Sequence, residues 1–136
     1  MTSEQWATIK HFTINENWGN PDKMDYGLLL MLDKYREAIN KPIIIHCGYA
    51  QDGHTVNSMH YKGQAVDCHV MHADLLDLYL VAKHLNFGGT GIYRWGIHLD
   101  NRSELAKQWC CIDDIYLPLT ADHVEMLRVR YAEEYK

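Results

Sequence analysis

The sequence lacks the features that mark several classes of protein. Its longest apolar run, Leu28 to Leu32, is far too short to cross a membrane, so we expect no membrane span. The chain has 13 basic residues against 18 acidic ones, and the basic residues form no cluster, which argues against nucleic acid as a partner. The first six residues contain no basic stretch followed by an apolar one. We therefore expect no signal peptide and synthesis in the cytoplasm.

Cysteines are also few, and their spacing matches no disulfide or zinc-finger pattern. There is no Cys-x-x-Cys pair, and the adjacent Cys110 and Cys111 are poorly placed to bond to each other. We expect free thiols in a reducing compartment; the alternative is a soft metal ligand, because Cys68 directly follows Asp67. Neighbouring residues of a strand point to opposite faces, so Cys68 is expected to face away from Asp67.

What is present is a chain able to form one core. It has 136 residues, of which 47% are hydrophobic, and it contains no repeat, linker or low-complexity segment. These values predict a single domain over residues 1–136.

Helical spacing of apolar residues predicts three helices. Asn20-Pro21-Asp22 is typical of a helix start, and apolar residues then recur at helical spacing up to Asn40, with Asp33 on the solvent side. A second helix is predicted from Ala73 or Asp74 to about Leu85. Thr120 is placed to cap a third, whose apolar residues are Val124, Leu127 and Tyr131.

Four further segments have strand character. The β-branched run 43–47 and residues 65–70 predict two strands, and residues 90–93 and 97–100 predict a hairpin around Arg94-Trp95-Gly96. A short strand-like segment at 11–14 precedes them, and residues 104–114 have no pattern that we can interpret. Because helices and strands are mixed rather than alternating, we expect an α+β fold with a small antiparallel sheet flanked by helices.

Three side chains have the types expected of a catalytic zinc site. His60 and Asp67 lie seven residues apart with Gly63 between them, and His98 lies in a predicted strand. Two imidazoles and one carboxylate leave a fourth position for water, whereas a structural zinc has four protein ligands. Gly63 allows a tight turn between the first two, and strands would hold Asp67 and His98 rigidly. The alternative is chance spacing, which we assume for the other histidines: His11, His46, His54, His69, His72, His84 and His123.

A family resemblance favours the zinc site. The string Ser58-x-His60-x-x-Gly63-x-Ala65-x-Asp67, followed by Gly91-Ile92-Tyr93 and His98-Leu99-Asp100, resembles the zinc D-alanyl-D-alanine carboxypeptidase family. That group includes the dipeptidases of vancomycin resistance, several phage endolysins and the hedgehog signalling domain. The similarity runs from about Phe12 to Asn101. It implies a hedgehog-like fold, Zn²⁺ held by His60, Asp67 and His98, and hydrolysis of peptide bonds in peptidoglycan stems, often at D-alanine.

The chain departs from that family at two positions. Relatives often carry an acid or a histidine a few residues before the last ligand, but residues 94–97 include neither. Asp100 is the candidate general base, because two residues along a strand it shares the face of His98; alternatively it orients an imidazole or caps the strand end. Ala50 stands where many relatives have an arginine that binds substrate, and Arg94 or Arg102 are candidates to replace it.

Other candidate substrate contacts have equally plain alternatives. Ser58 either caps the loop or contacts substrate, with the resemblance favouring contact. Tyr49, Tyr61, Tyr93 and Trp95 either line a cleft suited to peptide and sugar surfaces or pack in the core.

The sequence thus predicts a zinc peptidase that acts on cell-wall peptide, as a carboxypeptidase or an endopeptidase. Without a signal peptide it would suit a phage lysis enzyme that waits in the cytoplasm for release to the wall, or a tail-associated module. The main alternative is a phage structural or wall-binding protein that keeps the fold but not catalysis, which the missing base and Ala50 would explain. A metal-dependent binding module for another peptide is the third possibility.

Overall fold

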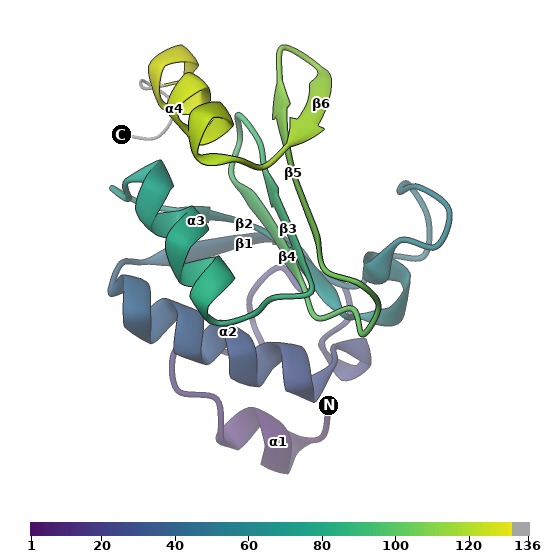
Figure 1. Cartoon of the computed structure of the whole chain (residues 1–136). Helices are drawn as coiled ribbons and strands as arrows, with labels where there is room; N and C mark the ends of the chain where they lie inside the picture. Colours follow the sequence, from purple (N-terminus) through teal and green to yellow (C-terminus); the bar gives the residue numbers. More distant parts are fainter. Residues whose placement is uncertain (132–136) are drawn as a thin grey trace.

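The structure of the chain, a computed structural model, describes residues 1–131 (Figure 1). The helices are α1 (Ser3–Ala7), α2 (Tyr26–Ile39), α3 (Leu75–His84) and α4 (Ala121–Arg130), with single 3-10 turns at η1 (Pro21–Lys23) and η2 (Met59–Lys62). The strands are β1 (Ile43–Cys47), β2 (Ala65–Val70), β3 (Gly89–Ile92), β4 (Ile97–Asp100), β5 (Lys107–Ile112) and β6 (Ile115–Pro118). No helix in the described part of the chain has both the length and the apolarity needed to cross a membrane.

The six strands form one mixed sheet in the order β1-β2-β4-β3-β5-β6. All neighbours pair antiparallel except β3 and β5, which are parallel. The α+β class is therefore confirmed, whereas the prediction of a small antiparallel sheet is wrong. Strands β5 and β6 lie in or just after the segment that had no interpretable pattern. Strand β5 joins the sheet by pairing with the edge of β3, a tertiary contact that periodicity cannot reveal, and β6 then pairs with β5.

One face of the sheet packs against helices α2 and α3 (Figure 1). From β2 the buried Val66 and Cys68 face these helices, and Ile97 and Leu99 do so from β4. Cys68 is fully buried, so the prediction that it faces away from Asp67 is confirmed. The opposite face of the sheet is consequently left to Asp67, His98 and their neighbours.

Helix α2 begins later than the sequence predicts. Asn20 caps only the short turn η1, after which Met24 is extended, with φ −72° and ψ 146°. The long helix starts at Tyr26, where the Asp25 carboxylate accepts a hydrogen bond from the backbone N–H of Leu28 at 3.0 Å. Two capping side chains in succession explain why the pattern reads as one helix start.

The N-terminal segment holds no strand, so the strand predicted over residues 11–14 is wrong. Its backbone is fixed instead by Asp33, whose carboxylate accepts hydrogen bonds from the N–H groups of Lys10 and His11 at 2.7 and 3.0 Å. Asp33 is thus buried and not on the solvent side as predicted. Asp33 binds backbone groups more than 20 residues away in sequence, and helical periodicity gives no information about such a contact.

The other predicted elements are confirmed. A tight hairpin joins β3 to β4, with the N–H of Tyr93 donating to the carbonyl of Gly96 at 2.8 Å. Helix α3 is capped by Asp74, and helix α4 by Thr120. The predicted apolar residues of α4 are buried, and the helix packs against α3 and β5.

Candidate metal centre

A row of paired residues crosses the sheet on the face away from the helices. The strand register pairs Cys47 with Asp67, Asp67 with His98, His98 with Gly91, and Gly91 with Trp109. Side chains of directly paired residues lie on the same face of a sheet. One residue from each of five strands is thereby brought into one line, and the first and last of them, Cys47 and Trp109, are more than 60 positions apart in sequence.

His60 reaches this row from η2, the short turn between β1 and β2. The Ser58 hydroxyl accepts a hydrogen bond from the His60 N–H at 3.2 Å and caps the turn. The turn ends at Gly63, whose φ is +67°. A β-carbon there would overlap the carbonyl oxygen of Lys23, so the glycine is needed both for its backbone angle and for lack of a side chain.

The predicted triad is brought together. His60 Nε2 lies 3.3 Å from Asp67 Oδ2, and His98 Nδ1 lies 3.0 Å from Asp67 Oδ1. Two ligand atoms of a tetrahedral zinc, each at about 2.0–2.2 Å from the ion, are about 3.4 Å apart. The nitrogen and oxygen donors are thus of the types that bind Zn²⁺, and both measured distances are close to the spacing of two ligands on one ion.

Each imidazole of the triad has its other nitrogen occupied. His60 Nδ1 lies 2.7 Å from the carbonyl oxygen of Gly48, and His98 Nε2 lies 2.8 Å from Asp100 Oδ2. Histidines that ligate metals typically donate their remaining N–H to a carbonyl or carboxylate, which fixes the tautomer and the ring orientation. The other two nitrogens, His60 Nε2 and His98 Nδ1, both face the Asp67 carboxylate, so the three candidate ligands are directed at one another, as binding of a shared metal ion requires.

Asp100 is fully buried and already has two partners. Besides His98, it accepts hydrogen bonds from the Arg102 guanidinium, at 2.9 Å to Nε and 2.5 Å to NH2. Gly89 makes room for it, since a β-carbon at that position would overlap the carboxylate. Arg102, one of the two arginines considered as a replacement at the Ala50 position, is thus committed to Asp100.

The charges of the cluster support one another. Burial would lower the pKa of His60, but hydrogen bonds to Asp67 and Cys47 together with the Asp67 charge raise it to about 10. Burial would raise the pKa of Asp67, yet hydrogen bonds from both imidazoles hold it well below its usual range. The pKa of His98 is raised against the effect of burial by its bonds to Asp100 and Asp67. The anionic carboxylate between two imidazoles is suited to hold a cation.

Aromatic rings surround the His98 side of the centre. The Trp109 ring lies 5.2 Å from the His98 ring, and its Nε1 donates to the Tyr93 hydroxyl at 2.6 Å. Tyr93 in turn stacks on Trp95 at 4.8 Å. Trp109 was missed by sequence reasoning, because it lies in the segment that had no pattern.

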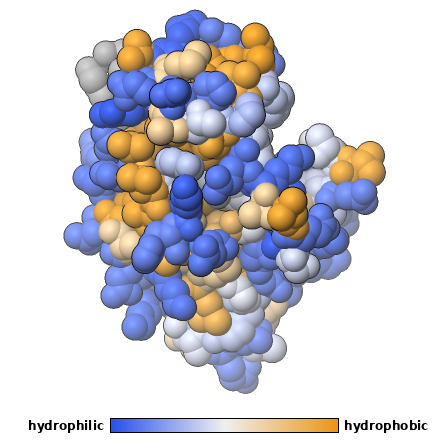
Figure 2. Space-filling view, in the orientation of Figure 1, coloured by the Kyte–Doolittle hydropathy of each residue, from blue (hydrophilic) through white to orange (hydrophobic). Residues whose placement is uncertain are grey.

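An open cavity of about 550 Å³ adjoins Asp67 and is lined by His46, Cys47, His69 and Trp95 as well. The loop before η2 and η2 itself form a lobe, at the right of Figure 1. In the space-filling view a hollow separates this lobe from the body of the protein (Figure 2). The centre therefore lies where a ligand can approach the sheet.

The remaining candidates lie farther out. Arg94 is exposed at the β3–β4 turn. The Tyr49 hydroxyl lies 3.4 Å from Lys23 Nζ, which also sits over the Tyr49 ring. The Tyr61 hydroxyl donates to the His54 carbonyl at 2.6 Å.

Two side chains beside the centre were not predicted as site residues. A β-bulge between Ile45 and Cys47 shifts the register, so that Cys47 and not His46 stands opposite Asp67. His54, on the loop before η2, stacks on His60 with ring centroids 4.2 Å apart. Neither feature leaves a signal in the sequence, since a bulge and a loop conformation have no periodicity.

Comparison with known proteins agrees with this geometry. The model of one protein family, described as Peptidase M15, matches residues 10–100, about two thirds of the chain. Neither the curated proteins nor the solved structures gave a match. The matched residues include His60, Asp67 and His98. The chain belongs to the peptidase M15 family, zinc metallopeptidases of the D-alanyl-D-alanine carboxypeptidase type.

Proposed function

We propose that this chain is a zinc peptidase that hydrolyses peptide bonds in the stem peptides of peptidoglycan. The observation that carries the proposal is the triad of His60, Asp67 and His98, with both outer imidazole nitrogens bonded to fixed acceptors. Family membership supports a metallopeptidase, and the resemblance to D-alanyl-D-alanine carboxypeptidases supports the choice of substrate.

When a metal displaces their protons, the three residues would offer two neutral imidazoles and one carboxylate, a set of three ligands that leaves a fourth position for water. Zinc bound there would polarise the scissile carbonyl and lower the pKa of a bound water to about 7. The carbonyl of Gly48 and the carboxylate of Asp100 hold the two imidazoles in the tautomers that ligation needs. The chain thereby presents its ligands in place before substrate arrives.

We assign Asp100 the role of orienting His98 and not that of general base. Its carboxylate is fully buried and accepts hydrogen bonds from both His98 and Arg102. Burial would raise the pKa of Asp100, but the hydrogen bonds from Arg102 and His98 together keep it well below its usual range, so Asp100 is a poor acceptor for a water proton. A base must also reach the water, and the side chain of Asp100 is enclosed behind the His98 ring.

The open cavity beside Asp67 is the proposed place for the peptide. Trp95 and Tyr93 form a stacked aromatic pair near it, and such rings suit peptide and sugar surfaces. Arg94 at the adjoining turn is the proposed contact for a substrate carboxylate. For Ser58 we propose the capping role, because its hydroxyl already binds the His60 N–H. Tyr49 is assigned to the support of η1 through Lys23.

A peptidase of this kind would meet its substrate only after release to the cell wall, as a phage lysis enzyme or a tail-associated module does. The rival, a wall-binding protein without catalysis, gains support from the lack of an acid before His98. Digestion of purified wall material separates the two.

The test begins with zinc content. Purified protein is expected to hold zinc in the triad, and His98→Ala is expected to lose it, while His84→Ala at the exposed end of α3 serves as the matched control. Purified peptidoglycan is then incubated with each protein. Release of D-alanine would indicate a carboxypeptidase, and new free amino groups in the cross-links would indicate an endopeptidase. Protein that carries zinc and sediments with the wall without cutting it would contradict the proposed function.

A further inference from the structure

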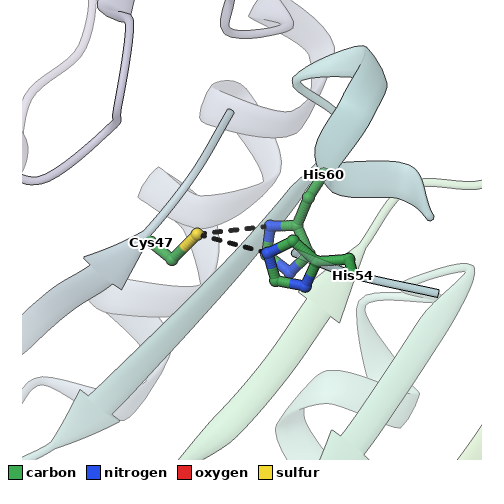
Figure 3. Close-up of side chains that lie close together, drawn as sticks. All are labelled: Cys47, His54 and His60. Carbon is green, nitrogen blue, oxygen red and sulfur yellow. Dashed lines mark hydrogen bonds between the residues drawn. The ribbon is translucent and has the colours of Figure 1, made fainter. Parts of the chain in front are cut away.

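A second cluster of metal-binding side chains shares one residue with the triad. Cys47 Sγ lies 3.8 Å from His54 Nε2 and 3.8 Å from His60 Nδ1 (Figure 3). The three come from separate segments: the end of β1, the loop after it, and η2. The sulfur and one nitrogen of each ring lie within 4.8 Å of one another, and in Figure 3 the Cys47 sulfur faces both imidazole rings.

The spacing fits a soft metal ion. A tetrahedral zinc has Zn–S of about 2.3 Å and Zn–N of about 2.0–2.1 Å, which places sulfur and nitrogen ligands about 3.6 Å apart. The two observed distances exceed that value by only about 0.2 Å. We propose that Cys47, His54 and His60 form a second site for a thiolate-preferring cation such as Zn²⁺ or Cd²⁺.

The β-bulge in β1 is what creates this site. The register without an extra residue would put His46 opposite Asp67, whereas the bulge turns Cys47 to that position. Its thiol then faces the ring of His60 instead of the core, where Cys68 lies. The cysteine at the second site and the carboxylate of the first site are therefore neighbours in the same row.

The shared imidazole makes the two sites compete. For ligation beside Asp67, His60 carries its proton on Nδ1, which donates to the Gly48 carbonyl, and its Nε2 is free. For ligation beside Cys47, the proton must be on Nε2, where Asp67 accepts it at 3.3 Å, and Nδ1 is free. A neutral imidazole has one free nitrogen at a time, so one metal excludes the other. The thiol proton of Cys47 passes to solvent when the second site fills.

Two changes let the second site close: His54 rotates, and the metal replaces the Gly48 carbonyl as the partner of His60 Nδ1. His54 and His60 are stacked at an interplanar angle of 18°, so their nitrogen lone pairs lie in nearly parallel planes. Tilting the His54 ring out of the stack brings its Nε2 lone pair onto the metal. His54 belongs to an exposed loop, where such a rotation displaces no core residue.

The consequence is inhibition by excess metal. Metal in the second site withdraws His60 from the triad, so activity that depends on the triad falls as free zinc or cadmium rises. This consequence rests on the proposed function; the second site itself does not.

The test titrates the metal-stripped protein with Cd²⁺ and follows the ultraviolet charge-transfer absorption of a cadmium–thiolate bond. The band is expected in the unmodified protein and in Cys111→Ser, and it is expected to vanish in Cys47→Ser. His54→Ala should weaken cadmium binding at Cys47 at least tenfold. Asp67→Ala, which breaks the triad, should keep the band, because the second site does not use that carboxylate.

Two outcomes would overturn the proposal: a band of full intensity in Cys47→Ser, or no band in both the unmodified protein and Asp67→Ala. A thermal melt of Cys47→Ser establishes that the variant folds. If the protein cut no peptidoglycan but gave the expected bands, the proposed function would fail and the second site would stand.

Discussion

At the scale of single residues, His98 connects the two carboxylates of the centre, because each of its ring nitrogens faces a different one. Nδ1 faces Asp67 at 3.0 Å and Nε2 faces Asp100 at 2.8 Å. The first carboxylate is a proposed ligand, whereas the second is locked by Arg102. Replacing Asp100 therefore separates an orienting role from a catalytic one.

Asp100→Asn should weaken zinc binding about 10–100-fold, the usual cost of losing a carboxylate behind a ligating histidine. If Asp100 only orients His98, activity should recover when zinc is raised to saturate the variant. Zinc affinity is measured with a competing chelator, and turnover is measured at saturating zinc. Turnover that stays low in fully loaded Asp100→Asn would return Asp100 to the role of base.

His60 predicts an unusual pH dependence of stability once zinc is stripped by a chelator. Its folded pKa of about 10 lies above the ordinary 6.5, so its contribution to stability is fully present below 6.5. That contribution is lost as the pH rises from 6.5 through about 10. The chelated protein should therefore become less stable over this range, as measured by urea unfolding at a series of pH values.

His60→Ala is the control, since it should lack this slope. An equal slope in that variant would mean that another group carries the effect. Zinc affinity should change in the opposite direction, because zinc displaces the His60 proton and binds more tightly as the pH rises.

At the scale of elements, the short turn η2 decides where His60 points. Gly63, which directly follows the turn and caps it, combines a φ of +67° with close contact to the Lys23 carbonyl. Gly53 has a similar φ of +87° but open space around it. Substituting each of the two glycines in turn therefore separates the cost of a left-handed backbone from the cost of steric overlap.

Gly63→Ala should destabilise the protein clearly more than Gly53→Ala, which should cost about 1–2 kcal/mol for the left-handed backbone alone. Gly63→Ala should also weaken zinc binding, because η2 must shift to relieve the overlap. Urea unfolding and zinc affinity are measured for both variants. Equal effects of the two changes on both quantities would contradict this account of η2.

The helices and strands that have their own periodicity or capping residues were predictable from the sequence, and those that depend on contacts with distant segments were not. Helices α3 and α4, strands β1 to β4 and the β3–β4 hairpin follow from periodicity and capping residues. The start of α2 was misplaced because Asn20 and Asp25 are both capping residues. Strand β5 depends on its parallel pairing with β3, which no local pattern encodes, and β6 depends on β5, with which it pairs.

The same distinction holds for the candidate site. His60, Asp67 and His98 were predicted from residue type, spacing and resemblance, and the structure places their side chains close together. Cys47 and His54 were missed because their positions depend on a bulge and on an irregular loop. Trp109 was missed because the strand that carries it, β5, was not predicted.

At the scale of the whole molecule, the helices and the metal centre lie on opposite faces of one sheet. Helix α4 lies outside the segment matched to the peptidase family, yet its Leu127 is fully buried. Packing at that helix and ligation at the centre should therefore be separable by mutation.

Leu127→Ala should lower the free energy of unfolding by about 2–5 kcal/mol while the zinc content stays unchanged. Val129→Ala on the exposed side of the same helix should change stability by less than about 0.5 kcal/mol. Urea unfolding and metal analysis of both variants check this expectation. Loss of zinc in folded Leu127→Ala would show that α4 supports the centre directly.

The row of paired residues across the sheet also has a consequence for how this protein can evolve. Asp67 and His98 lie within the segment shared with the family, but Trp109, next in the row beyond Gly91, lies outside it. A substitution at Trp109 would reshape the wall of the centre without altering any proposed zinc ligand.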